Sequence, residues 1–266
     1  GDFKYSVPSG YLACSTANLS ISDDIDPAQT DDNYPAKQFN VVTYTGNGST
    51  INVTGAGFQP DFVWIKGRSV GYDNMLFDTN RGTNKILKSN SSAAEITTVS
   101  TSLTSFDSDG FTYGSEASGN QSSATYVAWM WKCNGGTTTS DSSGDITVTR
   151  QTNDAAKFSI LTYTGNGSAA QTVGHGLGVE PDFVVARPRD NAGSNWVVWI
   201  RGMTLNGDSS SFLKLNAADA QSTSGQIENV SSSLITVDGN ANLSGKNQLL
   251  YCWANVEGFQ KFGTWE

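Results

Sequence analysis

The stretch FNVVTYTGNGS at residues 39–49 returns almost unchanged as FSILTYTGNGS at residues 158–168. Each copy is a run of apolar and β-branched residues that ends in Gly-Asn-Gly-Ser, which is typical of a β-strand followed by a tight turn. One copy would be ordinary in any all-β protein. Two copies predict that a whole structural unit is present twice.

The match continues beyond this opening phrase. Four further pairs of segments correspond: Pro60–Val63 with Pro181–Val184, Arg81-Gly82 with Arg201-Gly202, Leu103 with Leu234, and Tyr126–Trp129 with Leu250–Trp253. The two units then span residues 39–132 and 157–256, and each is long enough to bury a core of its own. A solenoid of repeats of about 20–50 residues does not fit this spacing.

Turn signals divide the first unit into short apolar segments. We expect strands at Phe39–Tyr44, Ile51–Val53, Asp61–Lys66, Asn74–Phe77, around Leu87, and at Leu103–Phe106, Phe111–Tyr113 and Thr125–Trp131. Strands of this length, separated by turns, are typical of two antiparallel sheets packed face to face. The sequence therefore predicts an all-β protein built from tandem antiparallel β-sandwiches of the lectin or jelly-roll kind.

The segments outside the two units differ from them in composition. Residues 21–38 form an acidic connector. Residues 133–156 are rich in Gly, Ser, Thr and Asp, which is typical of an interdomain linker, with one short strand at Ile146–Thr149. Residues 257–266 are interpreted as the lead-in to a further module.

Composition limits the classes of partner. The 266 residues carry 25 acidic and 16 basic side chains, a formal net charge of −9, without a Lys/Arg cluster. Nucleic acid and anionic membrane surfaces are therefore poor partners. The longest apolar runs are far shorter than the roughly 20 residues of a membrane span, so we expect no membrane insertion. Three cysteines are an odd, sparse set that favours synthesis in a reducing cytoplasm over a disulfide framework.

Several phrases carry a family resemblance. They are YTGNG at 44–48, PDFVWIK at 60–66, LFD-x-x-RG at 76–82, DGF at 109–111 and AWMW at 128–131, preceded by Gly10, Tyr11, Ala13, Asn18 and Leu19. This set resembles structural proteins of tailed-phage virions, in which the exit of a SPRY-like domain precedes such modules. The resemblance implies that residues 1–20 are the end of a preceding SPRY-like β domain. The second unit departs from the pattern, because Asp238-Gly239 is not followed by Phe.

The resemblance implies a component of a tail fibre or exterior appendage, made in the host cytoplasm and exposed on the particle. Its expected partners are other virion proteins, host-surface glycans and further copies of itself. It implies no settled chemistry.

One loop has the spacing of a calcium site. In Ser105–Glu116, the carboxylates of Asp107, Asp109 and Glu116 could take ligand positions, with Gly110 at the sharp turn. That loop normally lies between helices, however, whereas these residues are flanked by β-formers. A hairpin in which Asp109-Gly110 supplies the turn is the favoured interpretation, so we expect no metal.

The Gly-Asn-Gly-Ser turns at 46–49 and 165–168 could cradle a sugar or an anion with backbone amides. Turn chemistry alone explains these residues, and it is the favoured reading. The single histidine, His175, has no counterpart in the first unit and is expected to be a loop residue. Asp61 and Asp182 recur after Pro, which favours a cap at the start of a strand over half of an acid/base pair. The sequence therefore predicts no catalysis and no cofactor.

Binding residues are sought among the arginines and the many large rings. Arg81 and Arg201 recur before Gly; Arg81 pairs with Asp78 to pin a loop, or the arginines grip an acidic sugar. Six rings are more than two small cores need, so some could stack on sugars: Trp64, Tyr72, Trp131, Trp196, Trp199 and Trp253. The candidate ligand-binding residues are Trp64, Tyr72, Arg81, Trp196 and Arg201.

Three functions are compatible with these patterns. The first is a non-enzymatic virion appendage whose repeated modules recognise a host-surface glycan or protein. The second is a structural protein that decorates a capsid or builds a filament. The third, which the sequence favours least, is a polysaccharide depolymerase.

Overall fold

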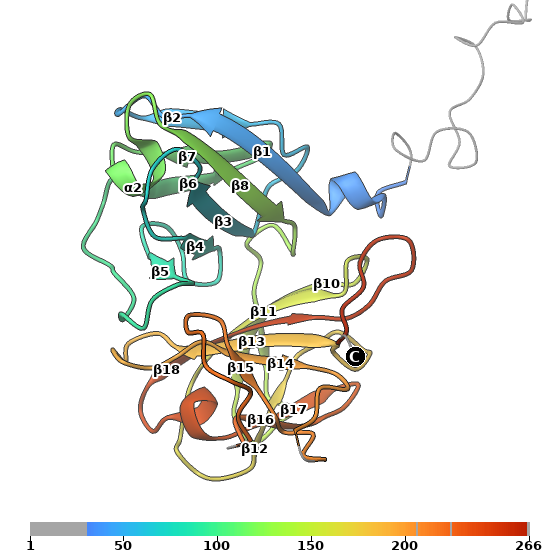
Figure 1. The fold of residues 1–266 in the computed structure, drawn as a ribbon. Helices are drawn as coiled ribbons and strands as arrows, with labels where there is room; N and C mark the ends of the chain where they lie inside the picture. The colour runs from blue at the N-terminus through green and yellow to red at the C-terminus, as the bar shows by residue number, and fades with distance from the viewer. Residues whose placement is uncertain (1–30, 206, 224, 265–266) are drawn as a thin grey trace, which may run out of the picture. The chain divides into compact units, whose positions relative to one another are not determined.

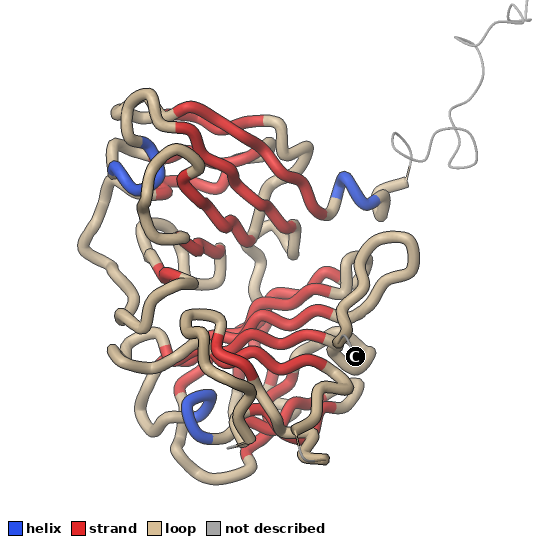
Figure 2. The backbone as a smooth tube through the Cα atoms, in the orientation of Figure 1, coloured by secondary structure: helices blue, strands red, loops and turns tan. Residues whose placement is uncertain are grey.

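The computed structural model describes residues 31–264, with the exception of 206 and 224. The expected domain exit at 1–20, most of the acidic connector at 21–38, and Cys14 lie outside the described residues. Residues from Pro35 onward form one compact unit. Strands dominate it, and its helices are single short turns (Figures 1 and 2).

The first module contains eight strands after a short 3-10 turn, η2 (Pro35–Lys37). They are β1 (Phe39–Thr45), β2 (Ile51–Thr54), β3 (Phe62–Gly67), β4 (Met75–Asp78), β5 (Leu87–Lys88), β6 (Leu103–Asp107), β7 (Gly110–Tyr113) and β8 (Thr125–Trp131), with the helical turn α2 (Ala117–Asn120) before β8. Every strand expected from the sequence in this module is present.

The second module repeats this series. Its strands are β11 (Phe158–Thr164), β12 (Gln171–Gly174), β13 (Phe183–Pro188), β14 (Val197–Ile200), β15 (Leu213–Lys214), β16 (Ile227–Val230), β17 (Leu234–Val237) and β18 (Asn247–Trp253), with η3 (Gly239–Asn242) before β18.

Sheet topology shows that the two modules are copies. The first has the strand order β1-β8-β3-β4-β5 in one sheet and β2-β7-β6 in the other; the second has β11-β18-β13-β14-β15 and β12-β17-β16. All pairings between these strands are antiparallel. The expectation of an all-β protein of tandem antiparallel sandwiches is confirmed.

The segment expected to be a linker is instead part of a sheet. Residues 133–156 form β9 (Thr139–Asp141) and β10 (Val148–Asn153), and β10 pairs with β11 from Thr149↔Thr162 to Asn153↔Phe158. Ile146 makes only an isolated bridge to Val173. The Gly/Ser-rich composition misled the sequence interpretation, and the VTRQTN sequence of β10 has no apolar alternation that would have marked it as a strand.

The register corrects three of the sequence correspondences. Phe39 and Phe62 both pair with Trp131, whereas Phe158 and Phe183 both pair with Trp253, so Trp131 and Trp253 are counterparts. Tyr126–Trp129 therefore corresponds to Gln248–Tyr251, two residues away from the expected match. Because the loops of the two modules differ in length, the sequence alone did not reveal this two-residue shift.

Arg201 likewise does not correspond to Arg81. The N–H of Arg201 donates to the carbonyl of Asp182 as the N–H of Thr79 donates to that of Asp61, so Arg201 stands at the position of Thr79.

The third correction concerns the small sheets. Leu103 pairs with Tyr113 and Ile227 pairs with Val237, so the counterpart of Leu103 is Ile227 and not Leu234.

Each module buries a core between its own two sheets. In the first, Val63, Phe77 and Phe111 belong to a cluster made only of first-module residues. In the second, the corresponding cluster includes Trp199 and Ile235. These positions alternate along their strands with residues that point to the opposite face of the sheet.

A third core joins the two modules. It combines Phe62, Leu76 and Leu87 of the first module with Phe158 and Tyr251, among others, of the second. The ring centroids of Phe62 and Tyr251 are 4.4 Å apart. The expectation that each module buries its aromatic interior by itself is therefore incomplete, because the outer faces of the two large sheets bury one another.

The repeated phrase is explained by a buried asparagine that lies far along the chain in each module. Asn120 accepts from the N–H of Asn47 at 2.8 Å and donates to the carbonyl of Ser49. In the second module Asn242 accepts from the N–H of Asn166 at 3.0 Å and donates to Ser168 at 2.7 Å.

The tyrosine of the phrase adds a second link in each copy. The hydroxyl of Tyr44 donates to the carbonyl of Gly119, and that of Tyr163 donates to the carbonyl of Ala241. The phrase thus encodes a turn that is closed by side-chain hydrogen bonds across the sandwich, which is a role in folding.

Candidate functional site

Three half-buried indoles lie together on the outer face of the first module's large sheet. They are Trp64 on β3 and Trp129 and Trp131 on β8, and we call them the tryptophan cluster. Trp64 is directly opposite Trp129 in the antiparallel register. Trp131 follows Trp129 by two residues, so alternation places it on the same face. Figure 1 shows β8 between β1 and β3.

The cluster surrounds a hollow of about 210 Å³ that is lined by these three side chains alone. The rings of Trp64 and Trp129 are 6.2 Å apart and meet edge to face at 67°. In the described part of the chain, none of the three indole N–H groups makes a hydrogen bond. The hollow therefore offers aromatic faces and unused donors, a combination that suits a sugar ring with apolar C–H faces and hydroxyl acceptors.

The rim of the cluster is also apolar on one side. Val41 of β1 lies opposite Trp129 and is 42% exposed, which is unusual for a large aliphatic side chain in this chain. On the other side, Lys66 follows Trp64 by two residues, and its Nζ donates to the carbonyl of Tyr72 at 2.9 Å. The lysine is thus held in place beside the hollow.

The corresponding face of the second module is closed. Tyr251 and Trp253 stand at the positions of Trp129 and Trp131, but they are 1% and 6% exposed. Phe62 stacks on Tyr251, and Phe262 of the C-terminal segment lies against Trp253. A ligand can therefore reach this face in the first module only.

The sequence predicted part of the cluster. Trp64 was predicted as a ligand-binding residue, Trp131 was one of six rings of which some were expected to be exposed, and both lie in the cluster. Trp129 was missed, although the strict alternation of buried and half-buried residues in Thr125–Trp131 identifies it. It lies on the same face as Trp131 because the side-chain period of a strand is two.

Two of the other predicted aromatic residues lie elsewhere. Tyr72 lies in the loop that follows β3, and its hydroxyl donates to the side chain of Gln121 at 2.8 Å. Trp196 is 0% exposed and donates from its indole to the carbonyl of Lys88 at 2.8 Å. Trp196 therefore holds the two modules together and cannot take a ligand as it stands.

The predicted arginines are also separated. Arg81 is buried, and its Nε lies 2.5 Å from Asp78, which confirms that this pair pins a loop. Burial acts to lower the pKa of Arg81, but the nearby Asp78, Tyr251 and Glu95 outweigh it and raise the pKa. Arg201 is 40% exposed and lies 3.3 Å from Asp182 at the surface.

The calcium candidates do not form a site. Asp109 accepts from the N–H of Gly57 at 2.6 Å, Asp107 accepts from Thr112 at 2.7 Å, and Glu116 caps α2. Across residues 31–264 as described, no group of three His, Cys, Asp or Glu is placed to hold a metal ion. β6 and β7 form a hairpin, which confirms that part of the interpretation, but its turn is Ser108-Asp109, and Gly110, with φ 148°, is already the first residue of β7.

The turns, the histidine and the recurring aspartates have internal roles. The Oδ2 atom of Asp61 accepts from the N–H of Cys133 at 2.6 Å, and that of Asp182 accepts from the N–H of Asn255 at 2.6 Å. Each carboxylate thus holds the segment that follows the last strand of its module, and this differs from the expected cap at the start of its own strand. His175 is buried; its Nδ1 accepts from Leu177 and its Nε2 lies 3.1 Å from the carbonyl of Ser231. Both ring nitrogens are therefore occupied, and a role as a general base has no geometric support.

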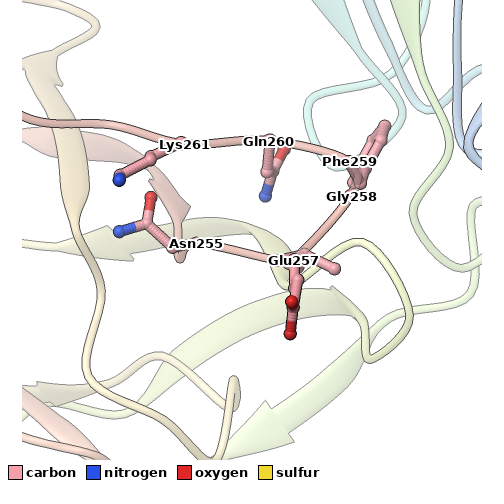
Figure 3. Close-up of a pocket in the computed structure, with 7 residues that line it drawn as sticks. Asn255, Glu257, Gly258, Phe259, Gln260 and Lys261 are labelled. Atoms are coloured by element: carbon pink, nitrogen blue, oxygen red, sulfur yellow. The ribbon is translucent and has the colours of Figure 1, made fainter.

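A second hollow, of about 530 Å³, lies at the turn from Asn255 to Lys261 (Figure 3). Two of its polar side chains are engaged within the chain: Gln260 donates to the carbonyls of Ala156 and Ala254, both at 2.7 Å, and Asn255 accepts from the N–H of Phe262. These bonds hold the C-terminal segment on the second module, so the tryptophan cluster remains the better candidate for binding.

No helix among the described residues is long and apolar enough to cross a bilayer.

Comparison with known proteins gives one match. A family model described as Domain of unknown function (DUF7483) matches residues 34–266, and the chain therefore belongs to this family. The match includes both modules and the strands between them, in agreement with the core that the modules share. No curated protein and no solved structure matches the chain.

Proposed function

We propose that this member of the DUF7483 family is a non-enzymatic virion component, part of a tail fibre or exterior appendage, that binds host-surface glycans through the tryptophan cluster. The single observation that supports the binding role is that three half-exposed indoles alone line a hollow on the surface. The virion assignment rests on the resemblance of the repeated phrases to tailed-phage proteins.

The chemistry of the hollow supports sugar recognition over acid/base catalysis. Apolar C–H faces of a pyranose stack on indoles, and ring hydroxyls can accept from the indole N–H groups. Carboxylates do not line the hollow, so glycosidic bond cleavage has no acid or nucleophile there. With so few polar contacts each site is weak, and useful avidity comes from several copies on one particle.

A glycan array tests this proposal directly. The full chain should bind a subset of uncharged host-surface glycans, and Trp129→Ala should lose at least about tenfold in affinity because a stacking ring is removed. Val179→Ser is the matched control, because Val179 is 39% exposed on the second module, away from the cluster.

Equal binding by the Trp129→Ala variant would overturn the assignment of the site. Absence of binding by the intact chain at any density on the array would overturn the glycan proposal itself. Release of soluble sugar from a bound polymer would contradict the non-enzymatic assignment.

One observation favours a second function, that of a capsid-decorating or filament-building structural protein. The outer face of the second module's large sheet is already buried against protein, so the same face of the first module could bind protein as well. In that case Trp129→Ala would abolish incorporation into particles and leave glycan binding, if any, unchanged.

A further inference from the structure

We propose that β1 pairs antiparallel with β1 of a second copy of this chain, so that two first-module sheets join edge to edge into one. This inference concerns an edge of the sheet, whereas the tryptophan cluster lies on its face. It does not depend on the proposed function.

The position of β1 leaves one of its edges open. β1 is the terminal strand of its sheet within the described residues, and it pairs with β8 alone, from Phe39↔Trp131 to Thr45↔Thr125. The N–H of Val41 donates to the side chain of Asn40 at 2.8 Å, so it does not point toward β8. By alternation, the backbone groups of Val41 and Thr43 face the open edge.

In the second module, the corresponding edge is already paired with a strand. β11 is the counterpart of β1, and its corresponding edge is covered by β10, with Thr162 opposite Thr149. Thr43 stands at the position of Thr162, because Phe39 and Phe158 begin the two strands. The fold therefore accommodates a strand on this side of the sheet without rearrangement of its other pairings.

The route that the second module uses is closed in the first. β10 reaches β11 through a short hairpin that follows Asn153. At the equivalent place, the N–H of Tyr34 donates to the carbonyl of Asp31 in a turn, and η2 follows directly. The described residues that precede β1 therefore do not form the same hairpin, so the edge is left to a strand that does not come from this connection.

The sequence of β1 suits pairing with itself. FNVVTYT has no charged residue and no Pro, which are the usual devices that protect an edge from a second strand. A two-fold axis at Val42 would place Val41 opposite Thr43 of the other copy and pair the edge-facing backbone groups of both. The uninterrupted register with β8 keeps the strand regular along its length.

The side chain of Asn40 is the single obstacle on this edge. It occupies the N–H of Val41 and also donates to the carbonyls of Gly55 and Ala56 at 3.1 Å. The edge N–H of Val41 is thus already hydrogen-bonded, whereas the edge N–H of Thr43 remains available for a second strand. We therefore expect a dimer in exchange with monomer and not a permanent one.

Pairing in this way would bring two tryptophan clusters onto one continuous sheet. Val41, Trp129 and Trp64 lie in one row across β1, β8 and β3. A second copy would continue this row beyond β1 on the same face, because the pleat is preserved across a paired edge.

Light scattering and sedimentation of the full chain test the pairing. The mass should rise with concentration toward twice the chain mass of 28.3 kDa. Thr43→Pro removes an edge N–H and should weaken dimerisation by at least about tenfold. Thr43→Lys should act in the same direction, by placing a charge on the edge, and serves if the proline variant fails to fold. Thr97→Lys is the control for charge, because Thr97 is exposed in a loop.

Amide exchange gives an independent readout. The Thr43 amide should exchange fast in dilute wild-type protein and slowly at high concentration. A monomer at every concentration, or a dimer unchanged by both Thr43 variants, would overturn the proposal. Protection of the Thr43 amide in the monomer would also overturn it, since a segment of the same chain would then cover the edge.

Discussion

The two large sheets have the same strand order, but the aromatic residues on their outer faces differ in burial. In the second module, Tyr251 and Trp253 are closed off by the first module and by the C-terminal segment. In the first module, Trp129 and Trp131 occupy the same positions and stay half exposed. The comparison teaches that the same face of a repeated fold can be part of a core or stay half exposed, depending on what covers it.

The cover over the second module is specific. The ring of Phe262 stacks on Phe183 at 5.1 Å with an interplanar angle of 5°, and Phe259 belongs to the same apolar cluster. The structural counterpart of Phe183 is Phe62, which is covered instead by Tyr251 of the other module. The asymmetry therefore comes from the C-terminal segment together with the other module.

Truncation of the buried ring should produce the largest effect. We expect Trp253→Ala to lower the free energy of unfolding by about 3–5 kcal/mol, because the side chain is almost fully buried and its removal leaves a cavity. Trp131→Ala, at the equivalent but half-buried position, should cost about half as much. Urea unfolding followed by far-UV circular dichroism measures both.

Equal losses of unfolding free energy for the two variants would show that the two faces are equally covered, which would contradict the difference in burial between Trp253 and Trp131. Because the two modules share a core, both variants should also unfold in a single transition. Two separate transitions would mean that the shared core does not couple the modules.

A smaller loss, about 3 kcal/mol, is expected for Asp78→Ala. Asp78 lies between the buried guanidinium of Arg81 and the hydroxyl of Tyr251, at 2.5 and 2.6 Å. Its removal leaves the buried guanidinium with only the longer ion pair to Glu95, at 3.3 Å, so most of the compensation of that buried charge is lost. The second module has Ile200 at the position of Asp78 and no ion pair there.

The double variant Asp78→Ile with Arg81→Met makes the first module resemble the second at this place. It should recover most of the stability, because well-packed apolar residues replace a buried ion pair at little cost. A double variant as unstable as Asp78→Ala would show that the loop needs the charges themselves. Thermal and urea unfolding of the three proteins distinguish these results.

The smallest expected effect is a pH dependence of stability that arises in the second module alone. Burial lowers the pKa of His175 to about 4, and the first module has no histidine. Below its ordinary pKa of about 6.5 the unfolded chain binds a proton that the folded chain does not, so stability is full above pH 6.5 and is lost as the pH falls toward 4. Between pH 7 and pH 5 we expect a loss of about 2 kcal/mol.

His175→Gln should flatten this dependence between pH 7 and pH 5, whatever it does to stability at pH 7. Arg150 and Asp141 also act on the imidazole, the arginine lowering and the aspartate raising its pKa. An unchanged slope in the variant would show that another group titrates in this window. Unfolding free energies at the two pH values provide the measurement.

Sequence reasoning succeeded where a signal is local. Apolar alternation and Gly/Asn turns located every strand of the first module, because these features act over a few residues. The Asp78–Arg81 pair was predicted for the same reason. The strand-entry cap expected of Asp61 was not found, because its carboxylate binds backbone N–H groups of the segment after β8, more than 70 residues away. The correspondence of Arg81 with Arg201 failed, because register depends on pairing with a distant strand and not on similar letters.

The candidate site was half predictable. Trp64 and Trp131 stood out as surplus rings, but nothing near Trp196 in the sequence indicated that Lys88 of the other module would cover it. Likewise, the composition of residues 133–156 suggested a linker, whereas β11 offered an edge on which part of this segment became a strand.

By itself, the sequence determined that the chain is all-β, that its unit occurs twice, and that a closed turn ends the first strand of each copy. Alternation and turn chemistry are properties of neighbouring residues, and they survive without any knowledge of the rest of the fold. The tertiary structure alone decided which of two equivalent aromatic faces is buried, because burial depends on what packs against a face from elsewhere in the chain.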